Sequence, residues 1–454
     1  MSIMVDFSNF STEELLRDGG FDCDCGYHHE APVKYLKIGS GAVKNIPDAL
    51  AALGCKKPYI VCDLNTKKAA WDRVEPVLKE AGIEYSMFCF NTTKRLEPNE
   101  EVMGAITFGF DKSCDVVLAL GSGVINDACK IIASIANIPA MVVGTAPSMD
   151  GYASNSSAMI IGGLKFSLYH GMPAAIICDT DIMKDAPMRM LWAGLGDMIA
   201  KYIAICEWRI GALINGDPYC EKIAILVRRS LDKVTSAADK LATRDPQVVG
   251  DIAEGLVLSG IAMSFAGNSR PASGLEHYFS HMWEMMALER GGDSDLHGIQ
   301  VGVGSYLTFK VYEQIKKLTP DKEKAMNWMK NFDAAKWEAD VQKWFGSVAP
   351  GIIASAAKDK RNDPERHAKR VELICENWDK ILKIIDEELP TFDRIMEIMT
   401  VSGMPIRPAE LGVSEDDVRA ALCASRDIRD KYLSSTMLWD LGLLYDMAAE
   451  FDGK

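Results

Sequence analysis

The sequence has no excess of positive charge. Its 454 residues include 50 Lys and Arg against 64 Asp and Glu, which gives a formal net charge of −14. A protein that binds nucleic acid needs a basic face to neutralise phosphates, so this balance excludes nucleic acid as a partner. The same balance means that an anionic substrate requires a locally positive site within a negative overall field.

Long apolar runs are also missing from the pattern. We find no segment with the length and apolar composition of a membrane span, and residues 1–7 lack a basic stretch followed by an apolar one. We therefore expect a cytoplasmic protein without membrane insertion. The 12 cysteines are dilute in a chain of this length. Most lie among apolar residues, so we expect reduced thiols rather than disulfides.

One local group combines thiols with imidazoles. Cys23 and Cys25 are followed closely by His28 and His29. Their spacing is not that of a standard zinc finger or zinc ribbon. We interpret the group as a turn that leads into the first strand, with metal binding as the less favoured alternative.

A chain of this length exceeds one ordinary hydrophobic core and predicts two domains. Between residues 34 and 181, short apolar segments alternate with helical patterns, which indicates a parallel sheet covered by helices on both faces. After residue 187 the pattern is that of long amphipathic helices. We predict an α/β domain at 1–187 and an all-helical domain at 188–454. The expected strands are Lys34–Ile38, Pro58–Cys62, Tyr85–Phe90, Asp115–Leu120, Ala140–Val143 and Ala174–Cys178.

A glycine-containing loop, Gly121–Asp127, joins the fourth expected strand to a helix. Glycines let the backbone approach a ligand, and a helix N-terminus offers N–H groups to a phosphate. This strand–loop–helix context is the one that a dinucleotide site needs. The third glycine of the standard fingerprint is replaced by Asn126, and no Gly-Lys-Ser/Thr follows, so the loop is not a P-loop. The alternative is a tight turn that binds no ligand.

A second loop, Thr145–Ser154, follows the next strand. Loops at the carboxyl ends of parallel strands bind ligands, and small hydroxyl residues with Asp150 suit a polar pocket. Ser148 or Asp150 could instead be an ordinary helix cap. Further upstream, Asp63 ends the strand Tyr59–Cys62 and fits the ribose of NAD, although Asn65 could serve as well.

Histidine is scarce, yet three of the seven histidines fall between positions 277 and 297. His277 and His281 are four residues apart and would share one face of a helix, and His297 follows a Gly-Gly turn. Neutral imidazole is the commonest ligand of a divalent transition metal. Two imidazoles with one carboxylate, here Asp197, leave a coordination position open, as catalytic metal sites do. The alternative is a set of ordinary core and surface histidines.

Several strings together resemble the sn-glycerol-1-phosphate dehydrogenases. They are Gly121–Asp127, Thr145–Gly151, Ser269–His277 and Ser434–Leu444. These enzymes belong to the superfamily of iron-containing alcohol dehydrogenase, glycerol dehydrogenase and dehydroquinate synthase. The resemblance implies an α/β nucleotide-binding domain with a parallel sheet, followed by an all-α domain that binds metal and substrate.

The resemblance also implies roles for single residues. Asp197, His277 and His297 would hold a divalent metal, zinc first, with nickel or iron as alternatives. Lys201 stands where some relatives carry a fourth ligand, a histidine, so a three-ligand site is expected. Asp150, Asp197 and His281 would serve the substrate and catalysis. NAD(H) or NADP(H) would contact Asp63, Gly121, Ser122, Gly123, Val124, Ile125, Thr145, Ala146, Pro147, Ser148 and Ser154.

The expected reaction is reversible hydride transfer from NAD(P)H to dihydroxyacetone phosphate, giving sn-glycerol 1-phosphate. The metal would act as a Lewis acid, and His281 would supply the proton through water. Arg270 or Lys201 would bind the phosphate. The alternatives are a glycerol or other polyol dehydrogenase, a dehydroquinate synthase, or a non-catalytic sensor of NAD and metal. We expect a homodimer, the commonest closed assembly.

Overall fold

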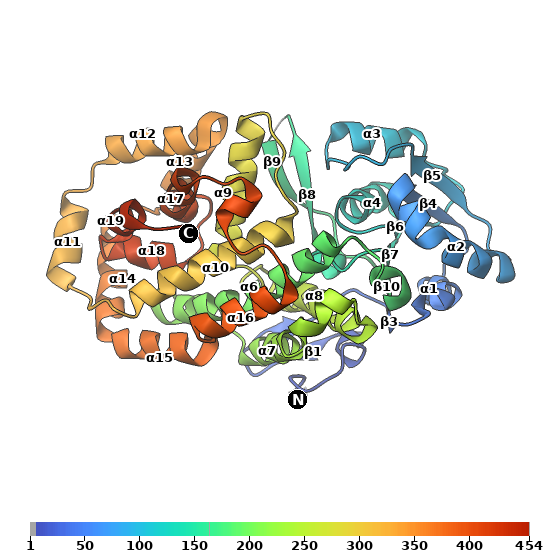
Figure 1. Ribbon diagram of the computed structural model, residues 1–454, viewed down its shortest axis with the longest axis horizontal. Coiled ribbons are helices and arrows are strands. Elements are labelled where there is room, and N and C mark those ends of the chain that lie inside the picture. The colour runs from blue at the N-terminus through green and yellow to red at the C-terminus, as the bar shows by residue number, and fades with distance from the viewer. Residues whose placement is uncertain (1–5, 163, 454) are drawn as a thin grey trace. The chain divides into compact units, whose positions relative to one another are not determined.

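The structure is a computed structural model that describes residues 6–162 and 164–453 (Figure 1). The chain forms two compact units that do not follow each other simply in sequence. The first unit contains the described residues up to Met198 together with Cys220–Pro271. The second contains Ile199–Tyr219 and the described residues from Ala272 onward. The domain boundary at residue 187 stays a prediction, and each unit is described by itself below.

A six-stranded parallel sheet lies at the centre of the first unit (Figure 1). All six expected strands are present, and none of their ends is displaced by more than one residue. In sheet order the strands are β3 (Tyr35–Gly39), β10 (Ala175–Asp179), β7 (Ala140–Gly144), β6 (Val116–Leu120), β4 (Pro58–Asp63) and β5 (Ser86–Phe90).

Helices cover both faces of this sheet. Ile60 and Leu118 pack in one core cluster with residues of two helices, α1 and α2. Tyr59 points to the opposite face, where its hydroxyl donates to the Ile106 carbonyl of α3 over 3.2 Å. Burial on both faces explains why the strands read as nearly continuous apolar segments. The helices are α1 (Ile46–Leu53), α2 (Leu64–Glu80), α3 (Glu100–Phe108), α4 (Gly123–Ala136) and α5 (Thr180–Met183).

Two antiparallel hairpins in the first unit were not predicted. β1 (Phe21–Asp22) pairs with β2 (His28–His29), and β8 (Ser156–Ile161) pairs with β9 (Leu164–Tyr169). β8 directly follows the second predicted ligand loop, so the hairpin fixes the far end of that loop.

Two helices from the helical half of the sequence pack in the first unit. They are α7 (Glu221–Thr235) and α8 (Pro246–Ala266), and α8 lies against β3 and the short helix η3 (Asp150–Ala153). α8 has the length and composition of a membrane span, with a mean hydropathy of 1.5, which corrects the expectation that no segment does. Within α8, 78% of the 18-residue stretch with this hydropathy is buried inside the structure, so α8 has the character of a core helix.

The described part of the second unit is helical. It contains most of α6 (Met188–Asn215), and α9 packs along α10 (Figure 1). The other helices are α9 (Leu275–Glu289), α10 (His297–Ile315), α11 (Lys322–Lys330), α12 (Ala334–Phe345), α13 (Ala349–Lys358), α14 (Pro364–Glu376), α15 (Trp378–Glu388), α16 (Phe392–Ser402), α17 (Glu415–Ala424), α18 (Ser434–Asp440) and α19 (Leu444–Glu450).

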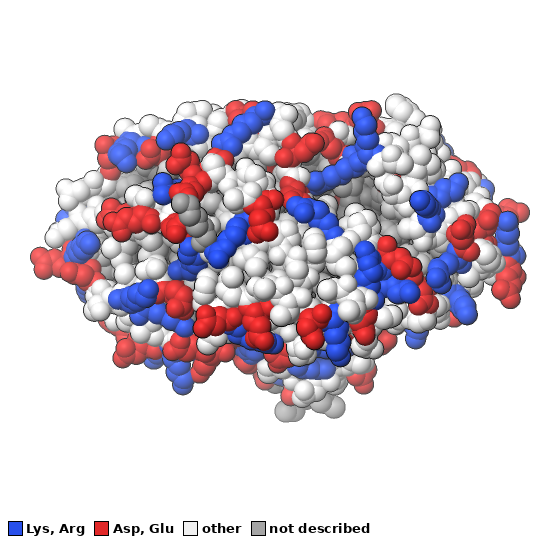
Figure 2. All heavy atoms as spheres, viewed as in Figure 1, with Lys and Arg blue, Asp and Glu red and all other residues white. Residues whose placement is uncertain are grey.

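Acidic and basic side chains are interspersed on the face shown in Figure 2. Ion pairs join many acidic and basic side chains of the described residues, for example Arg290 and Asp417 at 2.6 Å. On the face shown, the net charge of −14 is spread among charges of both signs.

Candidate functional site

The strand order of the first unit has a topological switch point between β4 and β6. From β4 the chain runs outward to β5 and then returns to β6 on the other side of β4. The connections therefore reverse direction between these two strands, and ligands of open α/β sheets bind at such a switch point. Val61 pairs with Ala119, so Asp63 at the end of β4 and Gly121 directly after β6 lie at the same edge of the sheet.

The glycine loop leads from β6 into α4 at this edge. Ser122 is the N-cap of α4 in an extended conformation, and its side chain makes no capping hydrogen bond. A Cβ on Gly121 would lie 2.9 Å from the Ile125 side chain, so packing alone requires glycine there. A Cβ on Gly123 would meet nothing within 4 Å. Open space at Gly123, beside the N–H groups that begin α4, is what a bound phosphate would need.

Asn126, which replaces the third glycine of the fingerprint, links two elements of the first unit. Its amide donates to the Gly151 carbonyl over 3.1 Å and so holds η3 against α4. Buried Lys130 extends this link, because its ammonium lies 2.9 Å from Asp127 and donates to the Ser156 carbonyl over 2.5 Å. Ser154, a predicted cofactor residue, lies in the same network, with its hydroxyl 2.9 Å from that of Ser156.

The loop Thr145–Ser148 is held from two sides. The Tyr152 hydroxyl donates to the Ala146 carbonyl. A Cβ on Gly194 of α6 would collide with the Pro147 carbonyl oxygen, so the glycine lets α6 touch the loop backbone. Gly194 was not predicted as a site residue, although it stands three positions before Asp197 in the same glycine-rich run. The loop therefore has a defined position at the carboxyl end of β7.

Asp63 is engaged by its own helix. Its side chain accepts from the Thr66 N–H over 2.7 Å, and the Thr66 hydroxyl accepts from the Asp63 N–H, which forms a capping box for α2. Asn65 donates to the Thr93 carbonyl over 2.9 Å. The ribose contact of Asp63 stays a prediction, and one of its carboxylate oxygens already serves as the helix cap.

Asp197 and Asp150 lie together in the first unit. The Asp150 N–H donates to Oδ2 of Asp197 over 2.9 Å, and the Ser259 hydroxyl of α8 donates to Oδ2 of Asp150 over 2.9 Å. The Asp197 side chain is fully buried. A backbone donor on one oxygen fixes the orientation of this carboxylate, as the partners of metal ligands do.

The three predicted histidines gather in the second unit. The ring centroids of His277 and His297 lie 5.3 Å apart, and that of His281 lies 6.3 Å from His277 and 5.9 Å from His297. α9 supplies two of the rings, and the first residue of α10 supplies the third. A Cβ on Gly304 would collide with the Glu276 carbonyl, so this glycine lets α10 approach α9 closely.

Two acidic side chains that were not predicted lie beside these imidazoles. Glu276 Oε1 lies 2.8 Å from Nδ1 of His277, and the two oxygens of Glu284 each lie 3.6 Å from Nδ1 of His281 or His297. Glu276 is adjacent to His277, and Glu284 follows His281 by three residues, so sequence spacing could have indicated both.

The donor set fits a divalent metal. Burial lowers the pKa of His277 well below its usual value, and the charge of Lys201 lowers it further, so the ring is neutral. In the tautomer with the proton on Nδ1, His277 donates to Glu276 and Nε2 has a lone pair, and a carboxyl partner of this kind is typical of a metal-binding histidine. Asp197 belongs to the first unit and the imidazoles to the second, so the structure describes the two parts of the predicted set separately.

Cations also lie near the imidazoles of the second unit. The charges of Lys201 and Lys431 both contribute to the lowered pKa of His277. Lys201 is fully buried and donates to the Ala272 carbonyl over 3.1 Å, and Lys431 donates to the Ser273 carbonyl just before α9. Lys431 was not predicted. Arg270, the other predicted phosphate residue, belongs to the first unit.

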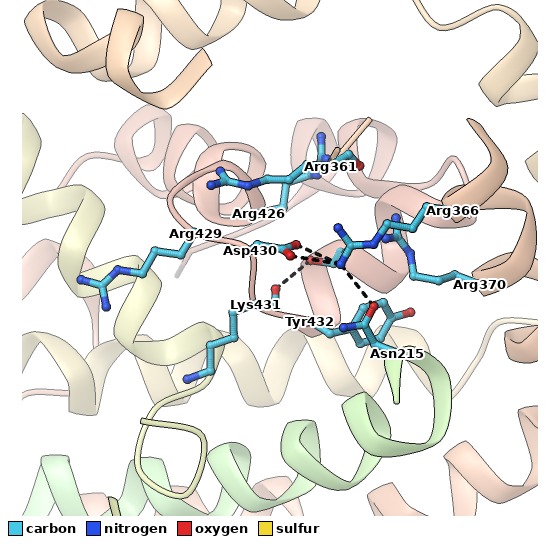
Figure 3. Close-up of a pocket in the computed structure, with 10 residues that line it drawn as sticks. Asn215, Arg361, Arg366, Arg370, Arg426, Arg429, Asp430, Lys431 and Tyr432 are labelled. Carbon is cyan, nitrogen blue, oxygen red and sulfur yellow. Dashed lines mark hydrogen bonds and ion pairs between the residues drawn. The ribbon is translucent and has the colours of Figure 1, made fainter. Parts of the chain in front are cut away.

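A small arginine-rich pocket lies beside Lys431 (Figure 3). Its volume of about 10 Å³ has room for a single water molecule. Arg370 binds Asp440 through two bonds of 2.8 and 2.6 Å, and Arg366 points to Asp430, whereas Lys431 points away from that pair. The pocket is therefore a structural cluster of paired charges. It is lined by Asn215, Arg361, Arg366, Arg370, Arg426, Arg429, Asp430, Lys431, Tyr432 and Thr436.

Comparisons with known proteins agree with this fold. A family model described as iron-containing alcohol dehydrogenase matches residues 37–187. Glycerol-1-phosphate dehydrogenase (NAD(P)+) of Halalkalibacterium halodurans is 33% identical over 64% of this chain and 74% of the relative. The Bacillus licheniformis protein of that name is 28% identical over 93% of each chain. The crystal structure of glycerol dehydrogenase from Schizosaccharomyces pombe covers 92% of this chain and 90% of its own, with 14% identity and a TM-score of 0.57.

The chain has the fold of the iron-containing alcohol dehydrogenases, and their family model matches part of its first unit. The chain belongs to the NAD(P)-dependent glycerol-1-phosphate dehydrogenase family, a metal-binding family of oxidoreductases. The predicted family, fold class and enzyme class are confirmed.

Proposed function

We propose that the protein reduces dihydroxyacetone phosphate to sn-glycerol 1-phosphate by reversible hydride transfer from NAD(P)H. The observation that carries the proposal is the grouping of three imidazoles with Lys201 and Lys431 in the second unit. Imidazoles suit a metal that activates a carbonyl, and ammonium groups suit a phosphate on the same small substrate. The name of the relatives, glycerol-1-phosphate dehydrogenase (NAD(P)+), supports a phosphorylated substrate and this cofactor.

Asp197, His277 and His297 would hold the metal, with zinc as the first choice and nickel or iron as alternatives. When bound, a divalent ion supplies a Lewis acid for the carbonyl oxygen of the substrate. The protein contributes prior orientation of its donors. The Asp150 N–H fixes Asp197, and the Glu276 carboxylate fixes His277.

The other residues bind the cofactor and move the proton. The N-terminus of α4, with the open space at Gly123, would take the pyrophosphate, and Thr145–Ser148 and Ser154 would border the nicotinamide half. Asp150 would contact the substrate. His281 would deliver the proton to the C2 oxygen through water, and its Nδ1 lies 3.6 Å from a carboxylate oxygen of Glu284.

The test compares phosphorylated and free substrate. We expect oxidation of NADH or NADPH with dihydroxyacetone phosphate, its loss on chelation, and its recovery when zinc is restored. Lys431→Met should raise KM for dihydroxyacetone phosphate by about 10- to 100-fold, the worth of one charge-assisted bond, without raising KM for free dihydroxyacetone. Lys383→Met is the matched control, because this side chain is 74% exposed. It should change the KM of neither dihydroxyacetone phosphate nor free dihydroxyacetone.

The other outcomes are informative. Faster turnover of free dihydroxyacetone than of its phosphate would place the enzyme among the polyol dehydrogenases. Binding of NAD and metal without turnover would support the sensor. Chiral analysis of the product identifies the isomer. We also propose a cytoplasmic homodimer, which sedimentation of the purified protein would test.

A further inference from the structure

A second group of potential metal ligands lies in the first unit. The ligand atoms of Cys23, Cys25, His29 and Cys220 all lie within 4.8 Å of one another. None of these residues belongs to the proposed cofactor, substrate or catalytic metal sites. The sequence pattern also placed His28 in this group. The His28 side chain is half exposed, however, and its Nδ1 lies 2.9 Å from the Asp22 carboxylate. The fourth member is Cys220, which local spacing could not indicate.

The β1–β2 hairpin brings three of the four side chains together. Phe21 pairs with His29, and the turn between the strands is closed by a hydrogen bond from the Cys23 N–H to the Tyr27 carbonyl of 3.1 Å. Gly26 has a φ of 88°, which only glycine adopts readily. The turn therefore folds Cys23 and Cys25 back toward His29. Cys220, the N-cap residue of α7, approaches from a distant part of the sequence.

The distances fit a tetrahedral ion. Sγ of Cys23 lies 3.8 Å from Sγ of Cys220, and Sγ of Cys25 lies 3.2 Å from Nε2 of His29. Zn–S bonds of about 2.3 Å at tetrahedral angles place two sulfur atoms about 3.8 Å apart. A disulfide needs an S–S distance of about 2.05 Å, and it would not involve the third thiol or the imidazole of the group.

His29 is oriented as a ligand. Its Nδ1 donates to the Phe265 carbonyl over 2.7 Å, and its ring stacks on the Phe265 ring at 5.7 Å. Because Nδ1 carries the donated proton, Nε2 offers its lone pair on the other side of the ring, where it lies 3.2 Å from Sγ of Cys25. A carbonyl partner on the other nitrogen is typical of metal-binding histidines.

Burial also argues against a redox role. The side chains of Cys23 and Cys220 are buried. Buried structural thiols are poor nucleophiles, whereas a metal can displace the thiol proton when it binds.

We propose that Cys23, Cys25, His29 and Cys220 bind one zinc ion in a closed, structural site. Four protein donors complete a tetrahedral shell and leave no position for substrate. The ion would fasten the N-terminal hairpin to the start of α7 and, through His29, to the end of α8. It would be a second metal, in addition to the catalytic one.

Cobalt substitution distinguishes the two metals. Thiolate ligands give cobalt(II) an intense near-ultraviolet charge-transfer band, and the proposed catalytic set of Asp197, His277 and His297 contains no sulfur. We expect the wild-type protein, refilled with cobalt alone, to show about one thiolate-bound ion per chain. Cys25→Ser and Cys220→Ser should each remove the band and lower the zinc content by about one equivalent.

Matched variants and a second measurement keep the test independent of folding. Cys55→Ser, at another half-buried thiol, and His28→Ala should retain the band and the zinc. In the wild-type protein, zinc should protect Cys23, Cys25 and Cys220 from alkylation until a chelator is added. A wild-type protein without the band, a band that survives both cysteine substitutions, or a Cys23–Cys220 disulfide in the mass spectrum would overturn the proposal.

Discussion

At the scale of single residues, the two imidazoles proposed as metal ligands each have a hydrogen-bond partner at Nδ1. Nδ1 of His277 lies 2.8 Å from the Glu276 carboxyl group, and Nδ1 of His297 lies 3.3 Å from the Ser280 hydroxyl. Such partners orient the rings of metal ligands, whereas the role proposed for His281 is proton delivery. We therefore expect His281→Ala to lower kcat by about 10²- to 10⁴-fold with little loss of metal. His277→Ala should lose metal and activity together.

Turnover and metal content, measured on the same preparations, check this prediction. Equal loss of metal in both variants would make His281 a ligand. Full activity of His281→Ala would assign the proton step to another group.

The sequence indicated the residues that share a local spacing. His277, His281 and His297 could be found because they follow helix geometry and a turn, and the structure brings them together. Cys220 and Lys431 could not be found in this way. Each approaches its group through the tertiary fold, and spacing says nothing about contacts over such separations.

At the scale of elements, buried Glu207 of α6 joins two helix N-termini. Its Oε2 accepts from the Leu275 N–H over 3.0 Å, and its Oε1 accepts from the Ser434 N–H and hydroxyl over 2.8 and 2.5 Å. One carboxylate thus caps the start of α9, two residues before His277, and the start of α18. It acts as a positioning residue for the imidazoles.

Loss of this double cap should be costly. Glu207→Ala leaves buried N–H groups without partners, at about 1–3 kcal/mol each, so we expect about 3–5 kcal/mol of destabilisation in urea unfolding. Metal content should fall as well, because α9 loses its anchor. Glu387→Ala, at a half-exposed ion pair with Arg209, is the control and should cost less than about 1 kcal/mol. Similar midpoints for the two variants would contradict the double cap.

The elements were predicted unequally for a physical reason. Strands of a doubly covered sheet are apolar along their whole length, so their ends stand out against polar loops. The β8–β9 hairpin was missed, although the Gly162–Gly163 pair between its two segments is a turn signal. The β1–β2 hairpin has two-residue strands, which are too short for any periodicity to appear.

At the scale of the whole molecule, the order of the chain does not separate the two units. α8 follows the predicted boundary at residue 187 by more than one helix, yet its Ser259 binds Asp150 and its Gly260 lies against Ala153. Periodicity identifies a helix but not the unit in which it packs. The sequence could therefore predict the change from an α/β to a helical pattern, but not that the chain returns to the first unit at Cys220–Pro271.

This arrangement predicts how fragments behave. A fragment that ends at residue 187 lacks α8 and exposes the apolar surface that α8 covers on β3 and η3. We expect it to unfold without a cooperative transition in urea, followed by circular dichroism. A fragment that keeps the residues up to Met198 and joins them through a flexible linker to Cys220–Pro271 contains the whole first unit and should unfold cooperatively. Cooperative unfolding of the shorter fragment would instead favour the boundary at 187, because a sheet that folds without α8 would be a domain by itself.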